Sequence, residues 1–386
     1  MKKVLSILLC ILLLCSCSAN KNTNENGESD SGIWISYYEL NSMLDSEKGF
    51  VTEFSTVLEN CKKLKIQNLY IHTRAFGESL YESQYFPLLK SAKAYDYDIF
   101  EFILSECKKA GLKVHAWINP YRISSSSEDI TKINSLSPAF KWLNDTDKQN
   151  DSNVCFSGGI YYNPASSDVL KLILDSIREL ITQYDVDGVH FDDYFYPSTD
   201  MEFDSISYNE YKKTAQTPLL LGDWRRENVN LLISSCHTVI EYMNKDIVFS
   251  VSPAADIKKN LNNLYADADC WIKNGYIDEI IPQLYFGFEY PDSKFSFLNL
   301  LEEWKELTRQ NTNVKLKIGL AFYKAEPTFD ADISEWKNND DIIARQVAVC
   351  ESDKAVGGYV YFSYSSVFSQ SEAFKRQREK LLEYLN

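Results

Sequence analysis

Apolar and polar positions follow two different periods along most of the chain. Short runs rich in valine, isoleucine and aromatic residues are typical of buried strands, and they alternate with longer stretches whose apolar residues recur at helical spacing. The short runs predict strands at residues 33–38, 68–74, 113–119, 188–192, 247–252, 279–285, 315–322 and 358–364. The longer stretches predict helices at residues 51–65, 99–110, 167–184, 227–244, 297–310, 341–351 and 371–385.

Strands that alternate with helices indicate an α/β fold with a parallel sheet. Eight such strands favour a closed (β/α)8 TIM barrel, because an open nucleotide-binding sheet would place a glycine-rich turn after its first strand. The sequence at that place is YYELNSM, residues 37–43, which contains no glycine. We expect the barrel to occupy residues 32–386, with insertions after strand three (121–162) and strand four (194–228).

The amino terminus predicts export from the cytoplasm. Lys2 and Lys3 precede an apolar run at residues 4–14 that is too short to span a bilayer, which indicates a signal peptide at residues 1–16. The sequence LCSC at residues 14–17 resembles a bacterial lipobox, so Cys17 would become the lipidated first residue; the alternative is an ordinary signal cleaved nearby. Residues 17–31 are poor in apolar side chains and predict a flexible tether. We therefore expect a cell-envelope protein, lipid-anchored to a bacterial membrane on its periplasmic or extracellular side.

The amino-acid composition narrows the classes of molecule that the protein is expected to bind. A net charge of −15 at pH 7 argues against nucleic acid, because no basic excess is available to neutralise phosphates. The 25 tyrosines and 7 tryptophans suit sugar faces and core packing equally. The six cysteines after Cys17 form no C-x-x-C pair, which favours buried free thiols over disulfides or a zinc site. We expect a monomer that uses no cofactor.

Polar and aromatic residues follow the carboxyl ends of the predicted strands. A parallel barrel brings all these ends to one rim, where barrel active sites are built. Rings and hydrogen-bonding groups around one cavity suit a polysaccharide substrate. The candidate rim residues are Arg74, Glu78, Trp117, Asn119, Arg122, His190, Asp192, Asp193, Gln283, Tyr285, Tyr323 and Tyr364.

Asp192 and Asp193 are the most informative of these residues. Side chains alternate along a strand, but both acids can reach the cavity where the chain leaves the sheet. Packed together they cannot both ionise easily, so one pKa should rise. A protonated acid beside an ionised one matches the chemistry of glycoside cleavage. The alternative is a helix cap or a turn of solvated acids.

His72, His115 and His190 stand on three neighbouring strands of the predicted barrel. Three inward histidines could bind a metal ion. Such histidines more often bond to neighbouring acids or carbonyls, so we expect no metal here.

Six blocks occur in order: HAWINPYR (115–122), YYNPASSDV (161–169), YDVDGVHFDDYFYP (184–197), GDWRRENV (222–229), FSVSP (249–253) and DEIIPQLYF (278–286). In these blocks the chain resembles the glycosyl hydrolase-like 10 family of bacterial lipoproteins and secreted proteins. The resemblance implies a TIM-barrel glycoside hydrolase acting on peptidoglycan-type glycans. Family motifs fall on Asn119, Arg122, Asp192, Asp193, Gln283, Tyr285 and the Trp224–Arg225–Arg226 block. Glu78 stands where the family usually has Asp.

The resemblance implies a retaining mechanism in one of two forms. In the substrate-assisted form Asp192 orients the acetamido nitrogen, Asp193 is the general acid and then the base, and Tyr285 binds the acetamido oxygen. In a direct double displacement Asp192 is the nucleophile, and Glu78 or Asp193 is the acid. A catalytically inactive, glycan-binding lipoprotein on the same barrel is the alternative function.

Overall fold

The computed structural model describes residues 30–244, 246–326 and 333–386, and its centre is a closed barrel of parallel strands. The order around the barrel is β1-β11-β10-β9-β8-β7-β3-β2, which confirms the predicted TIM barrel. The strands are β1 (Asp30–Ile35), β2 (Asn68–Arg74), β3 (Lys113–Ile118), β7 (Gly188–Phe191), β8 (Val248–Val251), β9 (Glu279–Ile280), β10 (Lys315–Ala321) and β11 (Gly358–Phe362).

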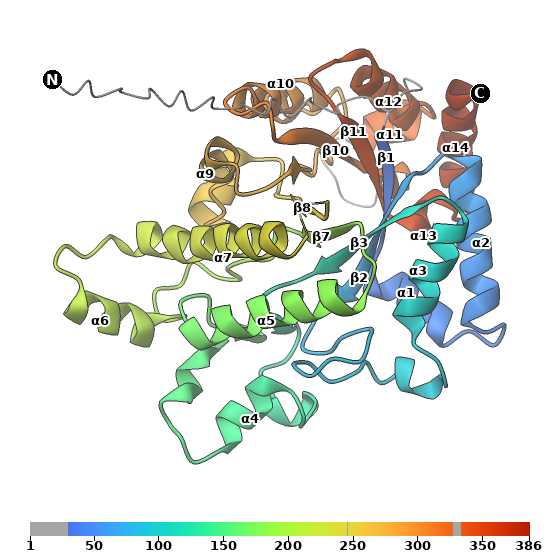
Figure 1. Ribbon diagram of the computed structural model, residues 1–386. Helices are drawn as coiled ribbons and strands as arrows, with labels where there is room; N and C mark the ends of the chain where they lie inside the picture. The colour runs from blue at the N-terminus through green and yellow to red at the C-terminus, as the bar shows by residue number, and fades with distance from the viewer. Residues whose placement is uncertain (1–29, 245, 327–332) are drawn as a thin grey trace, which may run out of the picture.

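Helices cover the outside of the barrel (Figure 1). Those that follow the strands are α2 (Phe50–Lys63), α3 (Ile99–Lys109), α5 (Ser167–Gln183), α7 (Leu221–Met243), α9 (Ala268–Asn274), α10 (Phe297–Thr308), α12 (Ile342–Ser352) and α14 (Glu372–Leu385). Shorter helices are α8 (Ile257–Lys259), α11 (Ile333–Asn338) and α13 (Tyr364–Val367). Within the described ranges, no helix combines the length and the apolar character that a membrane span requires.

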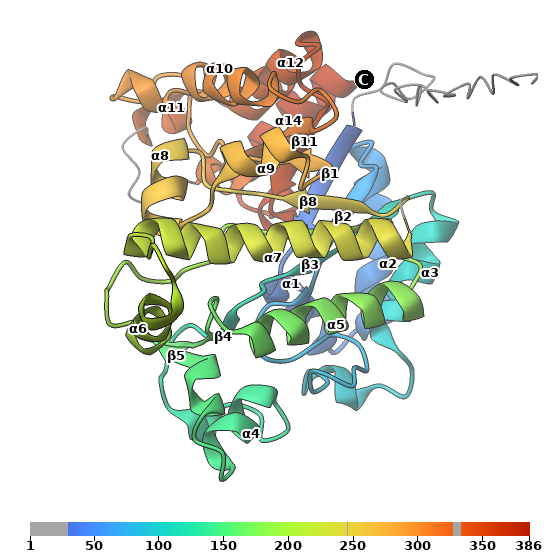
Figure 2. The same ribbon diagram turned by 60° about the vertical axis from the view of Figure 1, so that its left-hand side comes forward.

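The two large insertions lie after β3 and β7. The first contains α4 (Pro138–Asn144) and a small antiparallel sheet, β4 (Arg122–Ser124), β6 (Ile160–Tyr162) and β5 (Val154–Phe156), in the order β4-β6-β5. The second contains α6 (Ser205–Thr214) and projects from the barrel beside the first turns of α7 (Figure 2). Because α7 begins at Leu221, six residues before the predicted helix start at 227, this insertion is shorter than expected.

The first strand lies earlier in the chain than its pattern predicted. The strand expected at 33–38 is β1 at Asp30–Ile35, and α1 (Tyr37–Leu44) follows it directly. Ser36 starts this helix by accepting a hydrogen bond from the Tyr38 backbone, while Glu39 accepts one from the Ser36 N–H at 3.0 Å. The barrel therefore includes two residues assigned to the tether. The signal peptide, Cys17 and the tether as far as residue 29 lie outside the described residues.

The sixth strand is shorter than predicted. Only Glu279 and Ile280 form β9, although residues 279–285 were expected to be extended. Pro282 has no N–H to donate to the ladder, so pairing continues only as isolated bridges from Gln283 to Ala254 and Gly319.

An ionic cluster fills the amino-terminal end of the barrel. The Lys317 ammonium lies 3.0 Å from Asp30, 2.9 Å from Glu279 and 3.3 Å from the Tyr70 hydroxyl. Burial disfavours the charged amine, but the adjacent carboxylates hold the pKa of Lys317 above its ordinary value. The same lysine, with Lys315, lowers the pKa of Asp30 despite burial. The cluster closes this end of the barrel with paired charges.

Rings occupy the middle of the barrel. Tyr70 stacks on His115 with their centroids 4.5 Å apart, and Trp34 lies 5.8 Å from Tyr70. Gly188 faces this layer, and a Cβ there would come within 2.1 Å of His115 Nδ1. Glycine at this position leaves the room that the histidine ring needs.

We predict that Lys317→Met destabilises the protein by about 3–5 kcal/mol, because the buried ammonium is lost and only the partly exposed Lys315 remains to balance Asp30 and Glu279. Urea unfolding at pH 7 measures the effect. Lys315→Met is the matched control, since Lys315 is partly exposed and should matter less. Equal losses in the two variants would contradict the buried ion cluster.

Candidate active site

Asp192 is the first residue after β7 and is held from two sides. Its side chain is buried at 3% exposure. Trp117 Nε1 donates to one carboxylate oxygen at 3.0 Å, and the Tyr194 backbone N–H donates to the other at 3.1 Å. Trp117 comes from β3, the strand paired with β7. The orientation of this carboxylate is therefore fixed by two neighbouring strand ends.

Asp193 lies beside it and is partly buried. Gln283 Nε2 donates to Asp193 Oδ1 at 3.3 Å and to the Ser252 carbonyl at 2.9 Å. Since Gln283 follows β9 and Ser252 follows β8, the second acid is positioned from the opposite direction. The structure thus brings Trp117, Gln283 and both acids together.

The two acids change each other's ionisation. Burial and the charge of Asp193 raise the pKa of Asp192 to about 7. Burial also raises the pKa of Asp193, against the hydrogen bond from Gln283 that favours its ionised form. The two groups titrate as a pair, so the pair holds a proton to a higher pH than a solvated aspartate does.

His72 and Asn119 support Trp117. The His72 ring stacks on the Trp117 ring with centroids 3.8 Å apart and an interplanar angle of 7°. His72 Nε2 and Asn119 Oδ1 are 2.8 Å apart, and both residues are buried. Asn119, predicted to contact substrate, is fully buried and instead holds the layer that orients Trp117.

His190 lies within the barrel, not on its rim. Trp34 Nε1 can only donate, so the His190 Nε2 atom, 3.1 Å away, accepts; His190 Nδ1 then donates to Ser250 Oγ at 2.8 Å. Burial lowers the pKa of His190 well below its ordinary value. This neutral ring has no exposed surface, so the structure does not support its predicted contact with substrate.

Arg122 lies among aromatic rings, and its charge acts on both acids. Its guanidinium carbon lies 4.4 Å from the Tyr194 ring and 4.5 Å from the Phe76 ring, and its Nε donates to the Ala75 carbonyl at 3.0 Å. Its charge opposes the rise in the pKa of Asp192. Sequence reasoning predicted Arg122 at the rim but missed Phe76 and Tyr194, the rings that hold it.

Aromatic side chains form a wall on the other side of the acids. Tyr285 stacks on Phe362 at 5.7 Å and meets Tyr323 edge-on at 5.8 Å. Burial raises the pKa of Tyr285, and the charges of both aspartates add to the rise. Phe362 ends β11 and was not predicted. Tyr364 does not join the wall, because its hydroxyl accepts from Asn60 on α2.

Arg74, Trp224 and Arg225 have structural partners, and the structure does not support their predicted role in binding substrate. Arg74 is buried over the Phe86 ring at 4.3 Å, after a bulge in β2 that turns it out of the rim. Arg225 is fully buried in an ion pair with Asp204 at 2.6 Å. Trp224 packs against the tyrosines of α6. Arg225 and Trp224 fix the insertion after β7 to α7.

Glu78 also lies apart from the pair. One of its oxygens accepts from Asn134 Nδ2 at 2.7 Å, and the residue lines a different cavity between the loop after β2 and the insertion after β3. This position does not support Glu78 as the acid of a double displacement, the role the sequence left open.

The remaining histidines have polar partners from neighbouring strands. His115 Nε2 lies 3.2 Å from Asn68 Oδ1. In the described residues, no group of three or more histidine, cysteine or acidic side chains is placed to hold a metal ion. The six cysteines that follow Cys17 are free thiols, and five are buried.

A profile of the glycosyl hydrolase-like 10 family matches residues 31–337. The chain belongs to this family. It is 30% identical to glycosyl hydrolase YngK of Bacillus subtilis over 359 residues, covering 86% of this chain and 67% of that protein. It is 28% identical to glycosyl hydrolase DigH of Escherichia coli K12 over 332 residues, covering 79% and 73%. The matches thus span about two thirds to three quarters of these relatives.

Solved structures agree with the family in fold. The glycoside hydrolase domain of PgaB (BpsB) from Bordetella bronchiseptica aligns with a TM-score of 0.63 at 14% identity, covering 92% of this chain and 99% of that one. A GH18 chitinase from Cycas revoluta aligns at 0.51 and 13% identity, covering 93% and 100%. At these identities the likeness shows the barrel alone. Membership of the glycosyl hydrolase-like 10 family, on this barrel, supports a glycosidase-type activity.

We predict that Asp192→Asn becomes more stable relative to wild type as pH rises. A raised native pKa means that the folded wild type binds its proton more tightly than the unfolded chain, so wild-type stability falls between about pH 4 and pH 7. Urea unfolding should show the difference shifting towards the variant by roughly 2–3 kcal/mol between pH 5 and pH 8. Asp185→Asn, at an exposed site on the opposite end of the barrel, should show no such shift.

Proposed function

We propose that the protein hydrolyses glycosidic bonds in an N-acetylated polysaccharide of the peptidoglycan type, with the substrate's acetamido group as the nucleophile. The observation that carries this proposal is the coupled acid pair, in which Asp192 is fixed by two N–H donors and Asp193 is partly exposed. Membership of the family supports the reaction class, and the different surroundings of the two aspartates support different roles for them.

Asp192 is suited to orient the acetamido group. Both of its oxygens already accept a hydrogen bond, which limits its freedom to attack a sugar carbon as a nucleophile. An acetamido N–H that donates to Asp192 favours the ionised form of this carboxylate. The proton shared by the pair then rests on Asp193, where it is needed.

Asp193 is suited to transfer that proton. The acetamido oxygen attacks the anomeric carbon, the glycosidic C–O bond breaks, and the leaving oxygen takes the proton from Asp193. Asp193 then removes a proton from the water that opens the cyclic intermediate, so the anomeric configuration is retained.

The aromatic wall supplies the remaining contacts. The charges of both acids act on Tyr285, whose hydroxyl suits a hydrogen bond to the acetamido oxygen during attack. Tyr323 is 38% exposed and offers a ring face for a neighbouring sugar. Together these groups define a site for a sugar that carries an N-acetyl group.

We predict that wild type cleaves N-acetylated glycan strands at least about 10²-fold faster than the same strands after de-N-acetylation, since the nucleophile is then missing. Asp192→Asn and Asp193→Asn should each lower the rate by about 10²–10⁴-fold. Product analysis by mass spectrometry measures both effects, with Asp185→Asn as the control.

Equal rates on acetylated and de-acetylated strands would sink the substrate-assisted mechanism. Full activity in both aspartate variants would remove the pair from catalysis. Binding of strands without any cleavage by wild type would instead favour the inactive, glycan-binding barrel.

We further propose that Cys17 carries a lipid that holds the barrel at a membrane of the cell envelope, on the strength of the LCSC sequence at residues 14–17. Cys17→Ser should move the protein from the membrane fraction to the soluble fraction and abolish incorporation of labelled fatty acid. Unchanged fractionation of the variant would contradict the anchor.

A further inference from the structure

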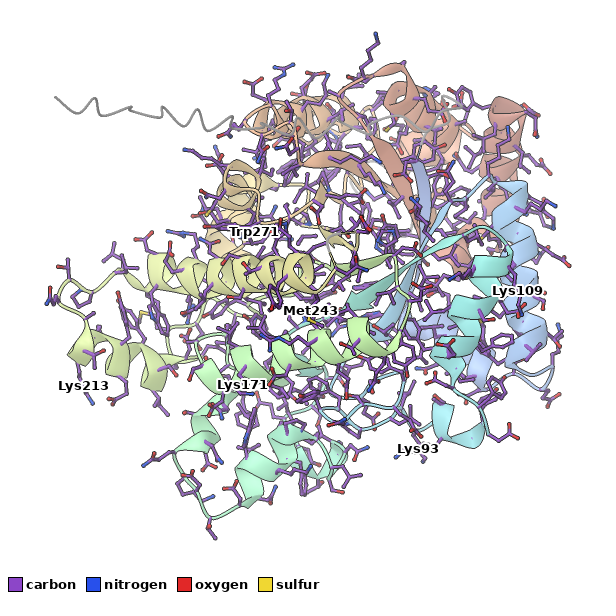
Figure 3. The ribbon with its side chains drawn as sticks, viewed as in Figure 1. Lys93, Lys109, Lys171, Lys213, Met243 and Trp271 are labelled. Atoms are coloured by element: carbon purple, nitrogen blue, oxygen red, sulfur yellow. The ribbon has the colours of Figure 1, made fainter. Side chains whose placement is uncertain are left out.

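A second cavity lies between the loop after β2 and the insertion after β3. Its volume is about 600 Å³, within the range of roughly 300–1,000 Å³ that small-molecule sites occupy. Its lining includes Phe76, Glu78, Lys90, Lys93, Lys132 and Asn134, and we call it the lysine cavity. Both ribbon views show these two chain segments side by side (Figures 1 and 2), and Figure 3 shows Lys93 on the segment between β2 and α3.

The lysine cavity is positive in a protein that is strongly acidic. Three lysines and one glutamate line it, although the whole chain has 40 basic and 55 acidic residues. Among the described residues, no carboxylate lies within 4 Å of the ammonium groups of Lys90 and Lys93, while Lys132 is 3.9 Å from Asp129 in an exposed pair. The single glutamate already accepts a hydrogen bond from Asn134. The ammonium groups therefore remain available to an anion.

Close packing between the two segments gives the lysine cavity a fixed shape. Asn134 Nδ2 donates to Glu78 Oε1 at 2.7 Å and so joins the insertion to the loop. Gly77 lies against Ile123, because a Cβ at this glycine would come within 3.2 Å of the isoleucine Cγ2. These contacts hold residues from both segments in place around the cavity.

Phe76 connects the lysine cavity to the acid pair. Its ring lines the cavity, and it also lies 4.5 Å from the Arg122 guanidinium carbon and 5.0 Å from the Tyr37 ring centroid. Arg122 acts electrostatically on both Asp192 and Asp193. A polymeric substrate that extends past Phe76 would contact both the acids and the lysine cavity.

We propose that the lysine cavity is a distal subsite that binds a carboxylate-bearing sugar of the glycan whose bond is cleaved at Asp192 and Asp193. This inference rests on the proposed function. A peptidoglycan-type strand without stem peptides carries a free lactyl carboxylate on every second sugar, and ammonium groups bind such a carboxylate through charge-assisted hydrogen bonds. The subsite would favour these strands over neutral N-acetylated oligosaccharides.

The test measures binding without turnover, by calorimetry at low salt in an Asp193→Asn background. The probes are peptide-free glycan strands with free lactyl carboxylates, the same strands with those carboxylates amidated, and a neutral chitooligosaccharide of equal length. We expect the free-carboxylate strand to bind about 5- to 30-fold more tightly than the other two. The preference should shrink in 0.5 M salt, because exposed charges are screened.

Replacing Lys90, Lys93 and Lys132 together with methionine should abolish the preference and leave binding of the chitooligosaccharide unchanged. The matched control replaces Lys62, Lys113 and Lys354, three exposed lysines elsewhere, and should keep the preference despite the same loss of charge. Glu78→Gln removes the opposing charge and should tighten binding of the free-carboxylate strand by about two- to fivefold.

Equal binding of free and amidated strands, or a preference that survives the triple substitution at the cavity, overturns the proposal. A preference lost equally in both triple variants also overturns it, since net charge would then explain the effect. Because these measurements need no turnover, their failure is separate from that of the proposed function, which is judged by cleavage of N-acetylated strands.

Discussion

Eight parallel strands can close into a barrel only if side chains fill the space that they enclose, and most features of this protein follow from how that space is filled. The amino-terminal end holds paired charges around Lys317. The middle holds the rings of Trp34, Tyr70 and the histidines. Trp34 donates a hydrogen bond to His190, and His115 lies within hydrogen-bonding distance of Asn68. The carboxyl-terminal end holds the acid pair, of which Asp193 is partly exposed. The ion cluster and the ring layer therefore form a rigid base beneath the acid pair that excludes water.

This base explains how the two aspartates ionise. In water two neighbouring aspartates would both ionise, but burial removes the solvation that separate charges need. Trp117 and Gln283 keep the acids in different hydrogen-bonding environments, so one is fixed while the other is partly open. The stacked His72 ring and Asn119 extend this support one layer further. The packing therefore gives the two acids different surroundings.

The partner of each charged residue near the rim decides whether its charge is neutralised within the fold or acts on the acid pair or a cavity. Arg225 and Asp204 neutralise each other in full burial and fix the insertion after β7. Arg122 has aromatic neighbours and no carboxylate bound to it in the described structure, so its charge is felt by the acid pair. Glu78 faces lysines across a cavity. Residue type alone did not separate these cases, because each depends on what lies opposite.

The sequence by itself determined the barrel, because strand and helix periods are local properties of the chain. Their alternation occurs in eight strand–helix units. It also determined that Asp192 and Asp193 follow the fourth strand, because adjacency in the chain survives folding. The sequence also contains the signal for the start of α1, because Ser36 and Glu39 form a capping box. The two tyrosines between them made this segment look like the end of a strand. Other features depended on tertiary contacts. A bulge turns Arg74 outward, and His190 bonds to a tryptophan 156 positions away. These outcomes depend on pairs of residues far apart in the chain, and such pairs are brought together only when the barrel closes.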